Sequence, residues 1–264
     1  MSEECVAGIQ ARLSSTRLPG KVLADLCGKP LIQRVYERTR AATLVDRVFV
    51  LTSDDPSDDP LVELLERLQI PHRRGPLRDV RARYLDLIDE LDPRFVVRVT
   101  GDCPFVEPDF LDLQLGALRA FDADLVRVAG NERGAAEGTL GGQSACSARA
   151  LRRTLVSDDP RDREHVASFF FTHRRASFRW VDVEVDEVFH RPGLRLAVDE
   201  AGDLAFARRI WEEMDPWGDG LFPLAQALRW LERYPDVVRR LHEDVVESRD
   251  NRALRRLARA GKLS

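Results

Sequence analysis

Residues 9–21 read I-Q-A-R-L-S-S-T-R-L-P-G-K and follow an apolar run, residues 5–9, that predicts a buried first strand. The Pro19-Gly20 pair predicts a turn, which would let the cations of the stretch converge on one anion. These cations are Arg12, Arg17 and Lys21. Cations and free backbone N–H groups in a loop after a strand are typical of a polyphosphate site. A solvated basic loop between a strand and a helix is the alternative that charge and turn chemistry leave open.

Size and composition restrict the classes of protein to which this chain can belong. The 264 residues suit one α/β domain with a sizeable core, and no apolar run approaches the ~18 residues of a membrane-spanning helix. Residues 1–4 are acidic, and the four scattered cysteines form no C-x-x-C pair, so we expect a cytoplasmic protein with reduced thiols. The 41 basic and 45 acidic residues nearly balance, which argues against a nucleic-acid or membrane partner.

Apolar runs alternate with apolar residues at helical spacing along most of the chain. Strands are expected at residues 5–9, 47–51, 95–99, 125–128, 178–185 and 194–198. Helices are expected near residues 31–42, 61–68, 79–91, 108–121, 148–156, 161–173, 201–214, 223–233, 236–248 and 252–260. This order predicts an α/β fold with three layers, in which helices cover both faces of a mainly parallel sheet. Ligands bind such sheets at the carboxyl ends of the strands.

Two aspartates follow predicted strands. Asp102 comes after residues 95–99 and beside Gly101, which lets a ligand approach, and Asp199 comes directly after residues 194–198. Mg²⁺ in proteins prefers one or two carboxylates, with water and phosphate oxygens completing its octahedron. The sequence therefore indicates a Mg²⁺ site, provided that the sheet brings both strand ends together. The alternative role of Asp102 is to cap the element that follows the turn.

The opening stretch resembles the signature I-Q-A-R-x-x-S-T-R-L-P-G-K of the sugar-acid cytidylyltransferases, in particular the spore-coat-polysaccharide type, which are relatives of the CMP-sugar-acid (KDO and sialic acid) synthetases. Further stretches resemble R-G-x-x-x-D-V-L-x-R-Y at residues 74–84, V-T-G-D-C-P at 99–104, R-E-H-V at 163–166 and L-R-L-x-V-D-x-x-x-D-L at 194–204. The resemblance implies a Rossmann-like nucleotide-diphospho-sugar transferase fold, formed as a single nucleotidyltransferase domain over residues 1–264. Within it, residues 131–192 are expected to serve acceptor binding and homodimerisation, and residues 220–264 to form a C-terminal helical extension.

The resemblance also implies roles for residues at the matching positions. Nucleotide binding is assigned to Gln10, Ala11, Arg12, Ser14, Ser15, Arg17, Lys21, Arg74, Gly75, Asp79, Arg83 and Gly101. The catalytic residues are Arg12, Lys21, Asp102 and Asp199, of which Asp102 and Asp199 hold Mg²⁺. The acceptor is expected near Gln143, Ser144, Glu164 and His165. Asp79 has an alternative role as a helix N-cap, His165 has an alternative role in packing, and Asp203 is expected to cap or orient.

The implied activity is Mg²⁺-dependent transfer of CMP from CTP to an acidic acceptor, such as a 3-deoxy-ulosonate, with release of pyrophosphate. The acceptor side matches less closely, because similar sequences carry G-L-D-V-E-V-F-S where residues 140–147 read L-G-G-Q-S-A-C-S. Gly142 and Ser144 thus replace an acidic pair. The alternatives are a phosphonate or phosphate acceptor, guanylyl transfer, or a nucleotide-binding scaffold without activity.

Overall fold

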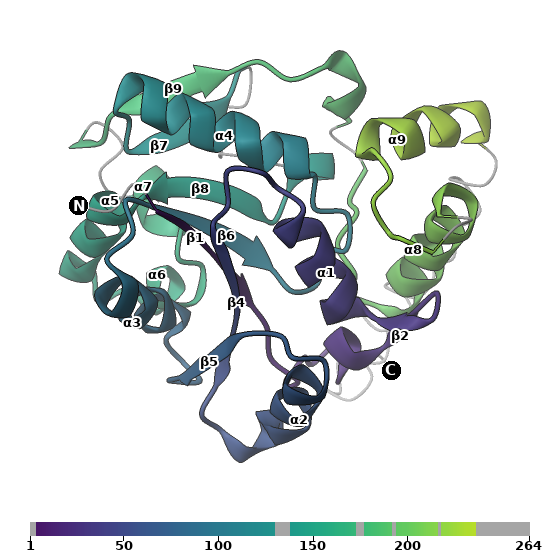
Figure 1. Cartoon of the computed structure of the whole chain (residues 1–264), viewed down its shortest axis with the longest axis horizontal. Helices are drawn as coiled ribbons and strands as arrows, with labels where there is room; N and C mark the ends of the chain where they lie inside the picture. Colours follow the sequence, from purple (N-terminus) through teal and green to yellow (C-terminus); the bar gives the residue numbers. More distant parts are fainter. Residues whose placement is uncertain (1–3, 130–137, 173–176, 192–193, 216–217, 236–264) are drawn as a thin grey trace, which may run out of the picture.

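The computed structural model describes residues 4–129, 138–172, 177–191, 194–215 and 218–235. Within these residues, a seven-stranded sheet has the order β5-β4-β1-β6-β8-β7-β9 (Figure 1). Its strands are β1 (Cys5–Gln10), β4 (Arg47–Ser53), β5 (His72–Gly75), β6 (Phe95–Thr100), β7 (Leu125–Val128), β8 (Gln143–Ser147) and β9 (Trp180–Val183). β5, β4, β1 and β6 are parallel, β7 and β9 are parallel, and β8 runs antiparallel to both of its neighbours. The mainly parallel α/β sheet expected from the sequence is confirmed.

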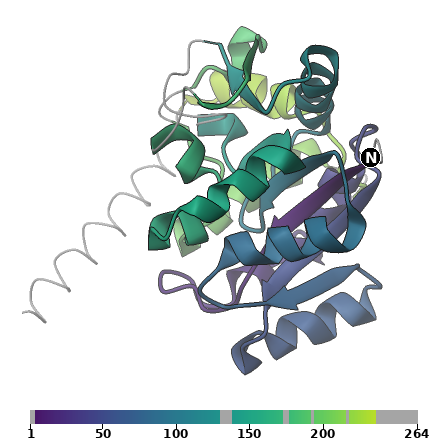
Figure 2. The ribbon, with the colours of Figure 1, turned by 90° about the vertical axis from the view of Figure 1, so that its left-hand side faces the viewer.

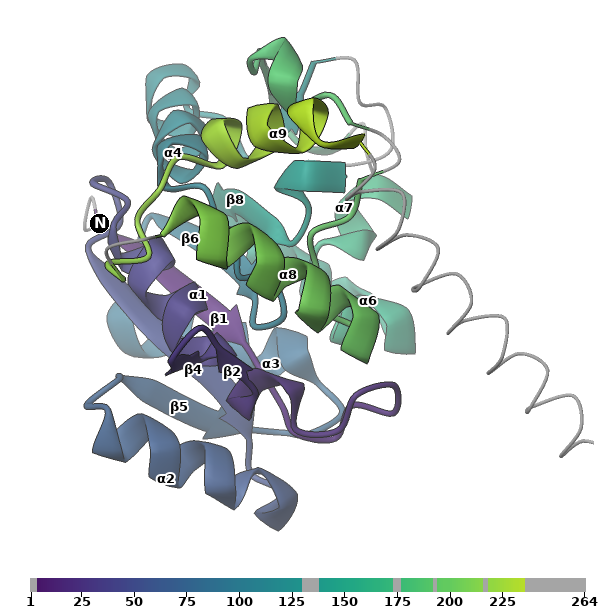
Figure 3. The ribbon, with the colours of Figure 1, turned by 90° about the vertical axis from the view of Figure 1, so that its right-hand side faces the viewer.

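Different helices cover the two faces of the sheet, which gives the predicted three layers. The side chains of β1 show the division, because Cys5 and Ile9 pack on the side of α1, α2, α4, α8 and α9, whereas Val6 packs on the side of α3, α5 and α7. Figure 2 shows the side that carries α3 and α5, and Figure 3 shows the side that carries α1, α8 and α9. The helices are α1 (Leu31–Arg40), α2 (Asp59–Arg67), α3 (Val80–Leu91), α4 (Pro108–Phe121), α5 (Ala148–Arg152), α6 (Pro160–Glu164), α7 (Ser168–Thr172), α8 (Ala201–Met214) and α9 (Leu224–Arg233).

Two buried arginines of α1 tie the C-terminal helices to the rest of the domain. Arg34 places its guanidinium carbon 5.2 Å from the centroid of the buried Trp211 ring in α8. Arg38 donates hydrogen bonds of 2.7, 2.8 and 2.9 Å to the backbone carbonyls of Val106, Gly220 and Phe222. Because α8 begins two residues after Asp199, this packing also fixes the place of that aspartate.

The strand expected at residues 194–198 is absent from the described chain. Residues 194–199 belong to neither a helix nor a strand, and the backbone N–H of Val198 donates to the carbonyl of Asp102 at 2.8 Å. The apolar side chains that suggested a strand are buried all the same, as Leu196 and Val198 show. The prediction was wrong because an alternating apolar run can bury its side chains without pairing in a sheet.

Other differences concern the second half of the chain. The helix expected at residues 161–173 is divided into α6 and α7, and the helix expected at 148–156 is α5 followed by a 3₁₀ helix, Arg153–Val156. The helices expected at 236–248 and 252–260 lie outside the described residues, as do residues 131–137. None of the described helices is long and apolar enough to cross a membrane. The single domain, the homodimer, the C-terminal extension and the cytoplasmic location stay predictions.

Gly8→Ala is expected to destabilise the protein by about 1–3 kcal/mol. A Cβ on Gly8 would lie 2.5 Å from Cε1 of Tyr84 and 2.7 Å from Cδ1 of Leu51, and both of these side chains are buried. Gly116→Ala is the matched control, because nothing lies within 4 Å of the corresponding Cβ position in α4 and alanine favours a helix. Urea denaturation measures both variants, and equal midpoints would contradict the tight packing around Gly8.

Candidate active site

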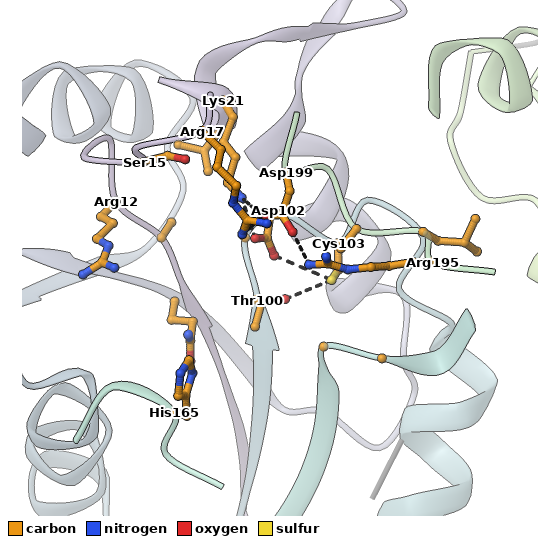
Figure 4. Close-up of a pocket in the computed structure, with 18 of the residues that line it drawn as sticks. Arg12, Ser15, Arg17, Lys21, Thr100, Asp102, Cys103, His165, Arg195 and Asp199 are labelled. Atoms are coloured by element: carbon orange, nitrogen blue, oxygen red, sulfur yellow. Dashed lines mark hydrogen bonds and ion pairs between the residues drawn. The ribbon is translucent and has the colours of Figure 1, made fainter. Parts of the chain in front are cut away.

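A cavity of about 810 Å³ opens at the carboxyl ends of β1 and β6. Its walls come from the opening stretch, the turn after β6, residues 139–142, the end of α6 and residues 194–199. Figure 4 shows that Lys21 and Arg17 point toward Asp102 and Asp199, whereas His165 lies to one side. The cavity therefore lies at the edge where parallel sheets bind ligands, as predicted from the order of the elements.

A buried carboxylate holds the opening stretch in place. Asp58 is fully buried and accepts a hydrogen bond of 2.7 Å from the backbone N–H of Leu13. Its other oxygen accepts from the backbone N–H of Ser53 at 3.2 Å, so the loop is joined to the end of β4. The turn itself is completed at Gly20, which has a φ of 68° and donates to the carbonyl of Leu13 at 3.1 Å. No role for Asp58 followed from the sequence alone, although the acidic run after β4 was a signal.

Lys21 bridges the two aspartates. Its Nζ donates hydrogen bonds of 2.7 Å to Oδ2 of Asp102 and 2.9 Å to Oδ1 of Asp199. Asp199, whose side chain is 2 % exposed, also accepts from Arg17 at 2.7 Å and forms an ion pair with Arg195. Three cations therefore surround one buried carboxylate at the cavity wall (Figure 4). Arg195 was not among the predicted site residues, although it lies inside the L-R-L run that was singled out.

Backbone hydrogen bonds fix Asp199 beside Asp102. The N–H of Val198 donates to the Asp102 carbonyl, which joins the segment before α8 to the turn after β6. Asp203 then accepts hydrogen bonds of 2.9 Å from the backbone N–H groups of both Asp199 and Glu200. Asp203 thus caps the start of α8, as expected from the sequence.

Comparison with known proteins decides the family. Residues 6–208 match the family model described as cytidylyltransferase. The chain belongs to the cytidylyltransferase family. The spore coat polysaccharide biosynthesis protein SpsF of Bacillus subtilis (strain 168) is 28% identical over 233 residues, which cover 87% of this chain and 94% of SpsF. The 3-deoxy-manno-octulosonate cytidylyltransferase of Geobacter sulfurreducens is 37% identical over 110 residues, which cover 42% of this chain and 43% of that enzyme.

Solved structures confirm the fold of this cytidylyltransferase. A cytidylyltransferase from Leptospira borgpetersenii serovar Hardjo-bovis superposes with a TM-score of 0.78 at 21% identity, covering 89% of this chain and 97% of that one. The CMP:2-keto-3-deoxy-manno-octonic acid synthetase complexed with CTP gives a TM-score of 0.60 at 19% identity, with coverage of 80% and 99%. The predicted Rossmann-like nucleotidyltransferase fold is therefore confirmed.

Most of the predicted site residues of this cytidylyltransferase line the cavity. They are Gln10, Ala11, Arg12, Ser14, Ser15, Arg17, Lys21, Arg83, Gly101, Asp102, Glu164, His165 and Asp199. Arg12 is oriented by Glu164, another residue of the cavity lining, to which it donates a hydrogen bond of 2.8 Å. The structure thus gathers residues that are far apart in the sequence, and their individual roles stay predictions.

A smaller group of predicted residues is absent from the described lining of the cavity, namely Arg74, Gly75, Asp79, Gln143 and Ser144. Asp79 is the N-cap of α3 and accepts from the backbone N–H of Ala82 at 2.8 Å, which is its alternative role. Arg74 donates to the carbonyl that ends β4 at 2.8 Å. Gln143 is buried and accepts from the backbone N–H of Glu107 at 3.0 Å. These side chains hold together the elements around the cavity.

Gly142 stands at one of the two positions where the chain departs from similar sequences. Its φ is 81°, in the region that favours glycine, and a Cβ there would lie 2.3 Å from Sγ of Cys103 and 2.6 Å from Oγ1 of Thr100. An acidic side chain at this position would therefore clash with the turn that carries Asp102. The local backbone conformation and packing therefore favour glycine at position 142.

The ionisation of the two residues in that turn follows from their surroundings. Burial raises the pKa of Asp102, but the charge of Lys21 and the hydrogen bonds from Lys21 and Thr100 outweigh burial, so the pKa of this carboxyl is lowered overall. Burial, followed by the negative charge of Asp102, raises the pKa of the Cys103 thiol to about 12. Asp102 is therefore a carboxylate at neutral pH and Cys103 a neutral thiol.

The aspartate pair fits the Mg²⁺ ion that the family resemblance implies. Asp102 and Asp199 each direct a carboxylate oxygen at the same Lys21 Nζ, so both oxygens converge. Across the described residues, no group of three or more histidine, cysteine, aspartate or glutamate side chains is placed to hold a metal ion. Two carboxylates are sufficient for Mg²⁺, because water and phosphate oxygens ordinarily supply its other ligands. The donor set therefore suits Mg²⁺ bound together with a nucleotide.

Lys21→Met is expected to lower the free energy of unfolding by about 1–3 kcal/mol at pH 7, because it leaves two neighbouring carboxylates without their shared cation. The lowered pKa of Asp102 fixes the sign of the pH dependence. The wild-type advantage is present above the ordinary pKa of an aspartate and is lost as the pH falls through the lowered one. Urea denaturation from pH 7 to pH 3 measures it.

Lys29→Met is the control for that series, because Lys29 pairs with Glu37 outside the cavity and is 31 % exposed. We expect a smaller loss of stability from this variant, since solvent screens an exposed pair. An equal loss from both variants, or a Lys21→Met deficit that grows on acidification, would contradict the assigned interaction.

Proposed function

We propose that this cytidylyltransferase transfers CMP from CTP to a sugar acid in a Mg²⁺-dependent reaction that releases pyrophosphate. The observation that carries the proposal is the contact of Lys21 Nζ with both Asp102 and Asp199, which joins the cationic opening stretch to the carboxylate pair. Cations of such a loop suit the phosphates of a nucleotide, and converging carboxylates suit a metal beside them. The two halves of a nucleotidyl-transfer site thus meet at one point.

The residues of the chain would act by positioning and by neutralising charge. Arg12, Arg17 and Lys21 bind the β- and γ-phosphates and stabilise the negative charge that grows on pyrophosphate as its bond to the α-phosphorus breaks. The acceptor oxygen forms its bond to the α-phosphorus in line with that leaving group. Asp102 and Asp199 would hold Mg²⁺, which supplies Lewis-acid polarisation of phosphoryl oxygens when bound.

A sugar acid is the proposed acceptor because similar proteins include 3-deoxy-manno-octulosonate cytidylyltransferases. A phosphonate or phosphate acceptor is the second candidate. It is favoured by Gly142, which lines the cavity where the pattern that the sequence resembles has an acidic residue, so that this part of the wall carries no negative charge. A less negative wall would tolerate an acceptor that carries more negative charge.

Pyrophosphate release tests the proposal. We expect release from CTP with Mg²⁺ and a sugar acid, with 3-deoxy-manno-octulosonate as the first acceptor tried, and little release from ATP, GTP or UTP. Other ulosonates, methylphosphonate and sugar phosphates form the rest of the acceptor panel. Release from GTP would favour guanylyl transfer. CTP binding without release for any acceptor would favour a binding scaffold and overturn the proposal.

Asp102→Asn and Asp199→Asn are each expected to reduce turnover at least ~100-fold, because each removes half of the carboxylate pair at the reacting centre. Asp89→Asn is the control, since Asp89 is 70 % exposed and pairs with Arg152 away from the cavity. Pyrophosphate release at saturating CTP gives the turnover, and urea denaturation confirms folding. Unchanged turnover in either cavity variant would remove the metal assignment.

A further inference from the structure

Arg98 is a cation in the cavity that has no carboxylate partner among the described residues. It lies in β6, two residues before that strand ends, and its half-buried side chain lines the same cavity as Asp102. Its Nε donates a hydrogen bond of 2.9 Å to Oε1 of Gln10. Within the described part of the chain, its guanidinium makes no ion pair and no other hydrogen bond.

The acidic side chains of the described cavity wall are already engaged by other cations. Their partners are Lys21 for Asp102, Lys21, Arg17 and Arg195 for Asp199, and Arg12 for Glu164. Each of these carboxylates thus pairs with a cation other than Arg98. Within the described residues, Arg98 therefore has no ion-pair partner, and an anion that enters the cavity can take that place.

The neighbouring strand β8 likewise places no charged residue opposite Arg98. In the antiparallel register of β6 and β8, the residue directly opposite Arg98 is Ser144. Opposed residues of two strands carry their side chains on the same face, close enough to pair. A carboxylate at position 144 would lie opposite Arg98 and would neutralise it. Serine is short and carries no charge, so in the described part of the chain β8 places no carboxylate opposite the guanidinium.

We infer that Arg98 binds the anionic group of the acceptor. A guanidinium offers two parallel N–H donors to a carboxylate or a phosphonate, which is the chemistry that both candidate acceptor classes share. Arg98 and Asp102 line one cavity from the same strand and its following turn, so an acceptor held by its anionic group at Arg98 can place its hydroxyl near Asp102. This inference rests on the proposed function and names the residue that selects an acidic acceptor.

The position of Arg98 separates it from the cations assigned to the triphosphate. Arg12, Arg17 and Lys21 all come from the opening stretch, and each already contacts a carboxylate that it can exchange for phosphate. Arg98 comes instead from the sheet, between Gln10 on one side and Ser144 on the other. Two separate anion sites in one cavity suit a reaction between two anions.

A titration with small probes tests the inference without knowledge of the true acceptor. The ¹⁵N-labelled protein is saturated with CTP and titrated with glycolate, methylphosphonate or neutral glycolamide. NMR follows the Nε–H signal of Arg98, which is assigned because it is lost in Arg98→Gln. We expect a saturable shift with at least one anion and none with glycolamide. Preference for glycolate identifies a carboxylate acceptor, and preference for methylphosphonate a phosphonate or phosphate acceptor. The inference is overturned if neither anion shifts the Nε–H signal, or if glycolamide shifts it as much as the anions do.

A pair of variants at Ser144 isolates the charge. Ser144→Glu places a carboxylate opposite Arg98, and Ser144→Gln places a neutral side chain of nearly the same size there. We expect the anion that shifts the Arg98 signal to bind at least ~10-fold more weakly to Ser144→Glu than to Ser144→Gln, because the introduced carboxylate competes for the guanidinium. Urea denaturation confirms that both variants are folded. Equal binding of the anion by the two folded variants would overturn the inference.

Kinetics give a second reading once the acceptor panel has identified a substrate. Arg98→Gln is expected to raise the KM for that acceptor by about 10- to 100-fold and to change the KM for CTP by less than ~3-fold. The reason is that the charged hydrogen bond removed by this substitution is made to the acceptor and not to CTP. An equal rise in both KM values would assign Arg98 to the nucleotide and refute the inference. If no acceptor in the panel releases pyrophosphate, the proposed function fails, whereas the probe titration still decides whether Arg98 binds anions.

Discussion

The ammonium group of Lys21 is the contact on which the site depends. It joins three segments that are far apart in the sequence, namely the opening stretch, the turn after β6 and the residues before α8. Two carboxylates as close as Asp102 and Asp199 would repel each other, and burial would favour protonation of Asp102. The shared cation, whose side chain is 10 % exposed, removes that conflict and keeps Asp102 charged. The carboxylate pair is therefore held together by the same residue that we propose to bind the phosphates.

Around this contact, hydrogen bonds to backbone groups hold the loops of the site in place. Asp58 accepts from the N–H of Leu13, Asp203 accepts from the N–H of Asp199, and the N–H of Val198 donates to the turn that carries Asp102. Such hydrogen bonds set where each loop begins and leave its cationic side chains free to change partners. The parallel pairing of β1 with β6 supplies the remaining constraint, because it brings the opening stretch and the Asp102 turn to one edge. The backbone of these loops is thus held in place by hydrogen bonds, while their cationic side chains can exchange one anionic partner for another.

The sequence predicted those parts of the fold that depend on local pattern. The apolar runs of β1, β4 and β6, and helices such as Ala201–Met214, are visible because periodicity and burial coincide in them. Residues 194–198 were mispredicted as a strand because their apolar side chains are buried in the hydrophobic core, and a sequence does not show which backbone segments pair in a sheet. Asp58 and Arg98 were missed for a similar reason. Their importance lies in what faces them, a backbone N–H for one and the uncharged Ser144 for the other, and both partners are distant in sequence.

The cavity also shows why overall charge is a poor guide to a small anionic ligand. The chain carries a net charge of −4, which argued against polyanionic partners with large surfaces. Yet the described cavity wall contains the cations Arg12, Arg17, Lys21, Arg83, Arg98 and Arg195 against the acids Asp102, Glu164 and Asp199. This wall carries an excess of positive charge where we propose that a nucleoside triphosphate and an acidic acceptor bind, and a concave site concentrates the resulting field. Repulsion between two negatively charged reactants is an obstacle to the proposed reaction. A wall with more cations than its own acids can neutralise lowers that obstacle before either reactant is positioned.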